Sequence, residues 1–325
     1  MSFEHDLQTD AVALAKKYSF FPGNAAQGFM LNTDVKAKPL KGDFEGFKRS
    51  HVKDDKVIAR VTLTLGLTDR GECLKVGPKL GGDSGVPVYF LPWDAKGAAV
   101  RMTIPDADPA LPEDQHPKIF FTAVLSGCSI IFKGSPQNPT IYHCGTEGGD
   151  AGTPTPSDTT KFSNSNDFFR KMLSGHGYRP IGAQINSNDY MIPKRSPAGS
   201  EAVSEAEQRF LDALKQQPQF QKGFILKSVN SWGSCFGVRK GRDWEFFLQN
   251  NGILTYDTYK WEFVTKEKEV IKKTFLGSKT VKTNYVTTAK IVTPGKLISL
   301  PMSVRRVFPG GGTASMLPDL SLMAL

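Results

Sequence analysis

Residues 118 to 146 read KIFFTAVLSGCSIIFKGSPQNPTIYHCGT, and this stretch carries the strongest structural signal in the chain. Its apolar runs are short, rich in Ile, Phe and Val, and bounded by Gly or Pro, which is typical of β-strands. We predict strands at 119–125, 129–133 and 140–144, and a loop of Gly, Ser, Pro, Gln and Asn joins the last two as a hairpin. The stretch therefore predicts a sheet with a hairpin at its centre.

Strand-like runs continue on both sides of this segment, and helix-like patterns are fewer. Short runs of β-branched and aromatic residues predict further strands at Ile58–Leu67, Val86–Trp93 and Ala98–Pro105. Amphipathic patterns and capping signals predict helices at 6–18, 167–174 and 201–217. Together they predict an α/β (α+β) fold, in which a central β-sandwich of mixed sheets is flanked by helices.

The length of the chain indicates its domain organisation. At roughly 150 residues per domain, 325 residues suggest about two units. We expect a catalytic core over 1–199. Over 200–325 we expect either a second lobe or a continuation of the same domain, with a flexible tail at 308–325. Within this second part, Gln249-Asn250-Asn251-Gly252 is typical of a hairpin turn between the strands DWEFFL and ILTYDTY.

Composition and charge exclude several classes of protein. The 41 Lys+Arg against 32 Asp+Glu leave a formal charge of +9 and a pI near 9.2, which favours acidic partners. The four cysteines include no C-x-x-C pair, so neither a disulfide framework nor a zinc site is expected. Walker and G-x-G-x-x-G motifs are absent, and no cofactor is expected. The N-terminus lacks the pattern of a signal peptide, and no apolar run is long enough for a membrane helix.

A cysteine and a histidine lie on the two arms of the predicted hairpin. If the strands pair symmetrically about Ser135 and Pro136, Cys128 faces His143. Directly opposed residues of an antiparallel pair have Cβ atoms about 4.5–5.5 Å apart, so the thiol and the imidazole would come within hydrogen-bond reach. The imidazole could then take the thiol proton, and the resulting thiolate could attack a carbonyl carbon. The spacing therefore predicts a nucleophile and its base.

Neighbouring residues fit the same chemistry. Gly127 has no side chain, so a substrate could approach the backbone there. Amide N–H groups around Ser126, Gly127 and Ser129 could hold the oxyanion of a tetrahedral intermediate. Thr122, on the preceding strand, could supply a hydroxyl that orients His143. The structural alternative is that the cysteine is a small core residue and the histidine an ordinary strand residue, because free cysteines are among the most buried residues.

The segment Leu125-Ser126-Gly127-Cys128, followed across the hairpin by His143, resembles the active-site motif of the bacterial toxin glutamine deamidases. These comprise the catalytic domain of the cytotoxic necrotizing factors and the Burkholderia lethal factor, and the chemotaxis receptor deamidases share the arrangement more remotely. The resemblance covers residues 118–146. It implies that Cys128 is the nucleophile, that His143 is the general acid and base, and that Thr122 orients the histidine.

The resemblance also implies an activity and a place of action. The chain would be a protein glutamine deamidase of the toxin or effector type, which converts a glutamine side chain of a host protein to glutamate through a cysteine thioester. A small GTPase or a translation factor helicase would be the substrate. The protein would be bacterial, secreted or injected, and active in the host cytosol. Neither a membrane span nor a nucleic-acid partner is expected.

Other functions stay open at this point. A non-enzymatic β-sandwich module could use the basic surface to bind an acidic partner or a nucleic acid, and residues 238–244, VRKGRDW, place cations beside an aromatic ring. A cysteine peptidase would use the same Cys128/His143 dyad on a main-chain amide. A transglutaminase would use it with an amine in place of water.

Two other motifs resemble known nucleophile segments, but their context contradicts them. Gly82-Asp83-Ser84-Gly85 resembles a serine protease segment, yet too few residues precede it for the first barrel of that fold. Gly233-Ser234-Cys235-Phe236 resembles a papain-like segment, yet no histidine follows it. The remaining cysteines are therefore expected to be core thiols: Cys73, Cys144 and Cys235.

Overall fold

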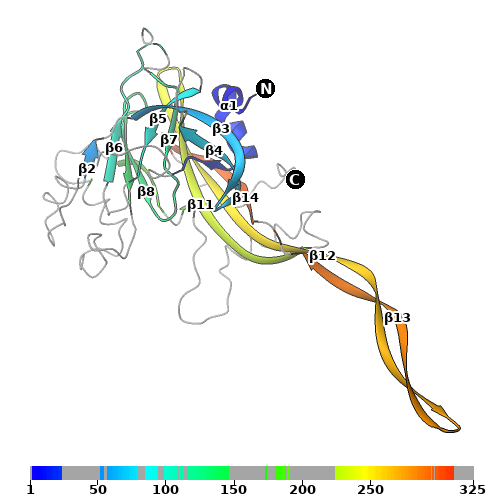
Figure 1. Cartoon of the computed structure of the whole chain (residues 1–325). Coiled ribbons are helices and arrows are strands. Elements are labelled where there is room, and N and C mark those ends of the chain that lie inside the picture. Colours follow the sequence, from blue (N-terminus) through cyan, green and yellow to red (C-terminus); the bar gives the residue numbers. More distant parts are fainter. Residues whose placement is uncertain are drawn as a thin grey trace, which may run out of the picture.

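The computed structural model of the chain consists mostly of β-strands (Figure 1). The one helix whose bounds lie within the described residues is α1 (Phe3–Lys17). None of the described helical structure is long and apolar enough to cross a membrane. The predicted helices at 167–174 and 201–217 lie outside the described residues, apart from Leu173. The structure describes residues 2–23, 52–54, 57–78, 85–93, 99–108, 110, 112, 116–145, 173, 181–186, 189–190, 224–293, 295 and 297–310.

Seven strands close into a barrel of mixed direction. The β5–β7 and β4–β14 pairs are parallel, and the other pairs around the barrel are antiparallel. The strands come from both sides of residue 200, and β1 (Phe20–Phe21) adds to β4 in parallel. Their order is β3 (Val57–Thr68), β4 (Gly71–Pro78), β14 (Leu297–Phe308), β12 (Asp243–Thr274), β11 (Phe224–Lys240), β7 (Ile119–Thr122), β5 (Val86–Leu91) and again β3.

A second, smaller sheet packs against the barrel. It is antiparallel except for the β2–β6 pair. A single hydrophobic core includes residues from both, such as Ile130 and Val100 of the small sheet and Phe246 and Leu248 of the barrel. The order of its strands is β10 (Ile181–Ile185), β8 (Ser129–Gly134), β9 (Pro139–Cys144), β6 (Ala99–Thr103) and β2 (Val52–Asp54).

The predicted helix-flanked β-sandwich is wrong. β3 pairs with β4 along one edge and with β5 along the other, so the large sheet closes on itself and leaves no free edge in the ring. The inside of the barrel is filled by its own side chains together with those of α1. Gly71, at φ +99°, permits the close approach of β4 and β14, because a Cβ there would lie 2.7 Å from the backbone of Ile298.

Strands β5 and β7 separate two hydrophobic cores, which explains their uninterrupted apolar sequences. Val88 and Phe90 belong to the core inside the barrel, whereas Tyr89 and Leu91 belong to the core shared with the small sheet. A strand that is buried on both faces has a continuous hydrophobic sequence. β7 alternates in the same way, and its last residue, Thr122, presents its hydroxyl to the small sheet.

The predicted hairpin turn at 249–252 is also wrong, because β12 runs straight through it. Gln249 is buried and binds the segment at the end of α1. Its Nε2 donates to the carbonyls of Ala15 and Tyr18, and its Oε1 accepts the N–H of Phe20 at 2.8 Å. Since the last carbonyls of a helix lack partners within the helix, these amide contacts stabilise the junction of α1 and the barrel.

Replacing Gln249 with leucine is expected to lower the free energy of unfolding by about 2–4 kcal/mol, because three hydrogen bonds to the α1 segment are lost and their partners stay buried. Urea denaturation measures the change. Gln8→Leu is the matched control, since Gln8 is exposed on α1, and it should change stability by less than about 0.5 kcal/mol. Equal stability of the two variants would contradict this role of Gln249.

β12 and β13 (Gly277–Thr293) form a long hairpin, of which residues 258–293 are called the arm below. β12 pairs with β11 and β14 up to Thr258 and Thr255 respectively, and from Thr258 to Thr274 it pairs with β13. Figure 1 shows the arm extending away from the barrel as a twisted two-stranded ribbon. The arm turns at Phe275 and Leu276.

Candidate active site

The three residues predicted to carry the chemistry lie at the boundary between the barrel and the small sheet, called the seam below. Thr122 ends β7, Cys128 directly precedes β8, and His143 lies on β9. Thr122 and His143 are fully buried, and Cys128 is 4% exposed. Cys128 also belongs to the hydrophobic core that the barrel shares with the small sheet.

The register of the hairpin differs from the prediction by two residues. His143 pairs with Ile130, so the predicted direct pairing of Cys128 with His143 is wrong. The turn is centred on Pro136 and Gln137 because the Asn138 N–H donates to the Ser135 carbonyl at 3.2 Å. Side chains alternate along a strand, and a shift of two residues therefore preserves the face. Cys128 itself lies one residue before β8, outside the paired residues, and its thiol does not hydrogen-bond Nε2 of His143.

The ring of His143 is oriented by Thr122. Thr122 Oγ1 lies 2.6 Å from His143 Nδ1, and the same hydroxyl donates its only hydrogen to the Leu91 carbonyl at 2.9 Å. The hydroxyl must therefore accept a hydrogen bond from Nδ1–H, which places the hydrogen of the neutral ring on Nδ1. Nε2 carries the lone pair, and it has no hydrogen-bond partner among the described residues. Such a nitrogen can act as a general base.

Burial keeps the His143 side chain uncharged. Removal of water from around the ring lowers its pKa to about 3. At neutral pH the resting site therefore contains a neutral imidazole. A proton taken from a thiol would stay on this ring only while a negative charge lies close to it.

Tyr190 holds the loop that carries Cys128. Its hydroxyl accepts the N–H of Gly127 at 2.9 Å and donates to the carbonyl of Cys128 at 2.7 Å. Burial raises the pKa of Tyr190 well above its usual value, so the phenol keeps the hydrogen that it donates. Gly127 has a φ of +130°, which residues with a side chain rarely adopt, and the loop therefore requires glycine at this position.

The residues predicted to surround an oxyanion occupy different environments. The Gly127 N–H is bound by Tyr190, and an oxyanion that used this group would have to displace the tyrosine hydroxyl. Ser129 is buried and pairs with Cys144 at the start of β8. Ser126 is exposed.

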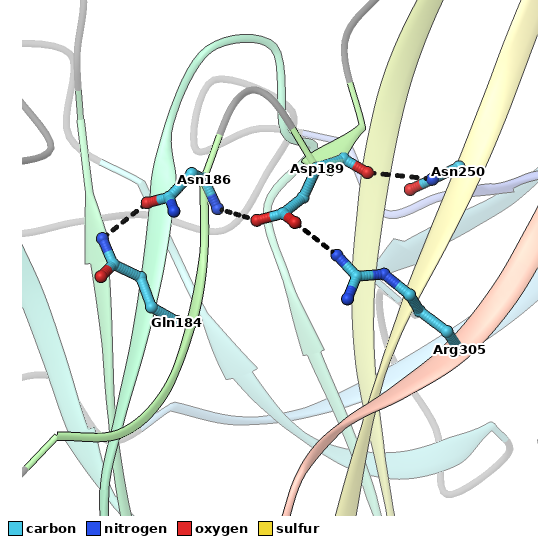
Figure 2. A network of polar contacts seen from close by, with 5 residues as sticks. All are labelled: Gln184, Asn186, Asp189, Asn250 and Arg305. Atoms are coloured by element: carbon cyan, nitrogen blue, oxygen red, sulfur yellow. Dashed lines mark hydrogen bonds and ion pairs between the residues drawn. The ribbon is translucent and has the colours of Figure 1, made fainter. Parts of the chain in front are cut away.

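A polar network fixes the residue next to Tyr190 (Figure 2). The Asp189 carboxylate accepts hydrogen bonds from Arg305 and from the Asn186 N–H, both at 2.7 Å. The Asp189 carbonyl accepts a hydrogen bond from Asn250 at 3.0 Å. Arg305 belongs to β14 and Asn250 to β12, so the network attaches this part of the chain to the barrel wall.

Sequence reasoning missed Tyr190. It lies 62 residues from Cys128 along the chain, in a polar segment, and no sequence pattern links the two. Its ring packs against Gly233, where a Cβ would lie 2.9 Å from the ring carbon Cγ. The glycine of the papain-like motif thus has a packing function, because it leaves space for this tyrosine.

Comparison with protein-family models and with curated proteins found no match to this sequence. Within the described residues, no group of three or more His, Cys, Asp or Glu side chains is placed to hold a metal ion. A proposal for the function therefore depends on the geometry of Cys128, His143 and Thr122 and on the motif around them.

The other three cysteines have the environment of core thiols. Burial raises the pKa of Cys73, Cys144 and Cys235, and a thiol that ionises less readily reacts more slowly. Cys128 is the most exposed of the four. Cys235, from the papain-like motif, lies inside β11, whereas residues 82–84 of the protease-like motif are outside the described residues.

Proposed function

We propose that this protein is a cysteine-dependent protein glutamine deamidase in which Cys128 attacks the side-chain amide of a glutamine in another protein. The hydrogen bond between Thr122 and His143 carries the proposal, because it leaves the Nε2 lone pair of a neutral imidazole in the same seam as Cys128. Covalent catalysis by a cysteine requires a base of this kind in the same site as the thiol. The resemblance of residues 125–128 to the toxin deamidase motif supports the same activity.

The proposed reaction consumes one water molecule and involves no change of oxidation state. Nε2 of His143 takes the proton of Cys128 Sγ as the sulfur bonds to the amide carbon. The C–N bond then breaks, and His143 gives the proton to the departing ammonia. Water attacks the thioester with His143 as its base, which releases the glutamate side chain and restores the thiol.

The proposal extends to the kind of substrate and to the place of action. The substrate is a host protein, such as a small GTPase or a translation factor helicase, and the chain acts in the host cytosol as a bacterial toxin or effector. Each turnover adds one negative charge to the target, because an amide becomes a carboxylate. The formal charge of +9 favours an acidic surface on that target.

Mass spectrometry of a host-cell lysate tests the activity. The full chain is incubated with the lysate, and glutamine-to-glutamate conversion is quantified for each protein alongside ammonia release. We expect conversion by the wild type and none above background for Cys128→Ser. Cys73→Ser is the matched control, since Cys73 is a buried thiol outside the seam, and it should convert the same glutamines.

Other products would contradict the deamidase assignment. Cleaved peptide bonds would indicate a peptidase, and amine adducts on glutamine would indicate a transglutaminase. Conversion that persists in Cys128→Ser would exclude the thioester mechanism. Iodoacetamide labelling gives a second check, because Cys128 should alkylate faster than the three core thiols near neutral pH.

A further inference from the structure

The arm is an exposed ribbon that the proposed active site does not use. Among the described strands, β13 pairs with β12 alone over 17 residues, which corresponds to a length of about 50 Å. An isolated two-stranded hairpin is marginally stable in water, and large apolar side chains exposed together mark an interaction site. The arm therefore has the properties of an interaction surface.

The end of the arm is the most exposed apolar feature among the described residues. Phe275 and Leu276, in the turn, are 104% and 96% exposed. Further along β12, beyond Lys272 and Lys273, Val270 and Ile271 are also exposed. Residues 270–281 are called the tip below.

The charge of the tip differs from that of the rest of the arm. The tip has three lysines, Lys272, Lys273 and Lys279, and no acidic residue. The remainder of the arm has five lysines and three glutamates, and two of the glutamates form ion pairs with Lys260 and Lys282. The positive charge of the tip is therefore not offset by acidic residues of the tip itself.

The three lysines surround the ribbon. Lys272 and Lys279 oppose each other across the two strands and share one face, whereas Lys273 points to the other face. Cations on both faces, directly behind an apolar end, match a ribbon that enters a lipid surface end-on. The apolar turn then reaches the acyl region while the lysines meet the headgroups on all sides.

We propose that the tip docks on an anionic lipid bilayer, with Phe275 and Leu276 inserted below the headgroups and Lys272, Lys273 and Lys279 bound to acidic lipids. This inference is independent of the proposed deamidase activity. Anionic headgroups supply the complementary charge, and the attraction is worth about a fivefold gain in affinity for each lysine near the surface.

The distribution of side chains favours a membrane over a nucleic acid. A ribbon that lies in a groove of a duplex directs its cations and aromatic rings to the phosphates and bases along its length. In the rest of the arm, called the shaft below, the exposed aromatic residues Trp261, Phe263 and Tyr285 lie about 30–45 Å from the turn and cannot act together with it. Cations also lie beside aromatic rings of the shaft, as where Lys290 Nζ is 3.9 Å from the centre of the Tyr259 ring, but the shaft has three glutamates whereas the tip has none.

Vesicle co-sedimentation tests the proposal with the full chain. The wild type should bind vesicles of phosphatidylcholine with phosphatidylserine and bind phosphatidylcholine vesicles far less. Phe275→Ser combined with Leu276→Ser should weaken binding about a hundredfold, because both apolar anchors are lost. These side chains are fully exposed, so the double variant should fold like the wild type.

Matched variants on the shaft control for a general effect of the arm. Phe263→Ser removes a phenylalanine that is 82% exposed and should leave vesicle binding unchanged. Neutralising Lys272, Lys273 and Lys279 to glutamine should weaken binding about a hundredfold. The same change at Lys260, Lys266 and Lys268 should weaken it less than tenfold. Cys128→Ser should bind like the wild type, which separates this test from that of the deamidase.

Several results would overturn the proposal. One is equal vesicle binding by the Phe275→Ser/Leu276→Ser variant and by Phe263→Ser. Another is equal binding of the wild type to vesicles with and without acidic lipid. Binding of a DNA duplex that depends on Phe275 and Leu276, without vesicle binding, would indicate a nucleic acid instead. Tip-dependent dimerisation in light scattering, again without vesicle binding, would indicate a second copy of the chain. For Phe275→Trp, bound to vesicles, we expect quenching by brominated lipid tails, which Phe263→Trp should not show.

Discussion

Replacing His143 with asparagine is expected to lower the rate of glutamine deamidation by about 10²- to 10⁴-fold, the range that general acid–base catalysis contributes. The asparagine amide can still donate to Thr122 Oγ1 from near the position of Nδ1, so the contact with β7 is preserved. The variant has no group in place of Nε2. The loss of rate would therefore report the missing base and not a displaced strand.

Two variants of Thr122 separate the orientation of His143 from its basicity. Thr122→Val removes the acceptor for Nδ1–H, so the ring can adopt the other tautomer, and the rate should fall by about 10- to 100-fold. Thr122→Ser keeps the hydroxyl and should retain most of the activity. Deamidation of a purified substrate, followed by ammonia release, measures all three variants. A His143→Asn rate within a few-fold of the wild type would exclude His143 as the base.

Acid is expected to destabilise the wild type more than the His143→Asn variant. The pKa of His143 is about 3 in the folded protein, against 6.5 for an ordinary histidine. Below pH 6.5 the unfolded chain binds a proton at this residue that the folded chain does not bind. The contribution of His143 to the free energy of unfolding is therefore fully present above pH 6.5, and it is lost as the pH decreases from 6.5 towards 3.

The size of this effect follows from one proton. It amounts to at most about 1.4 kcal/mol per pH unit, so between about pH 7 and about pH 5 the wild type should lose about 2 kcal/mol more than His143→Asn. Urea denaturation of both proteins at these two pH values measures the difference. Glu4 and Glu245 also have lowered pKa values and weaken the fold in acid, but both proteins contain them. Equal losses of unfolding free energy in the two proteins would show that His143 becomes protonated without unfolding.

Local sequence was sufficient to predict many of the helices and strands. Alternating or continuous apolar runs predicted β3, β5, β6, β8 and β9 with boundaries close to those observed, and the amphipathic pattern predicted a helix at 6–18, where α1 spans Phe3–Lys17. The prediction of a turn at 249–252 failed for a specific reason. Asn-Gly favours a tight turn on its own, but the amide of Gln249 is required inside the barrel to bind the α1 segment, and this tertiary contact outweighs the local preference.

The candidate site was only partly predictable. Cys128, His143 and Thr122 could be selected from the hairpin and its motif, because all three lie within a short stretch of chain. Their relative geometry depended on the loop, where the Asn138–Ser135 hydrogen bond moved the register by two residues. Tyr190 could not be selected, since it reaches the Cys128 loop through a contact between segments 62 residues apart.

The sequence by itself determined that this protein is rich in β-strands and that a cysteine and a histidine lie on one hairpin, because strand periodicity and short loops act over a few residues. Only the tertiary structure decided that the large sheet closes into a barrel, and that Thr122 and Tyr190 meet His143 and the Cys128 loop. The tertiary structure also decided that the arm projects beyond the barrel. These features depend on pairing and burial between distant segments, and their free energy comes from contacts that local sequence does not record.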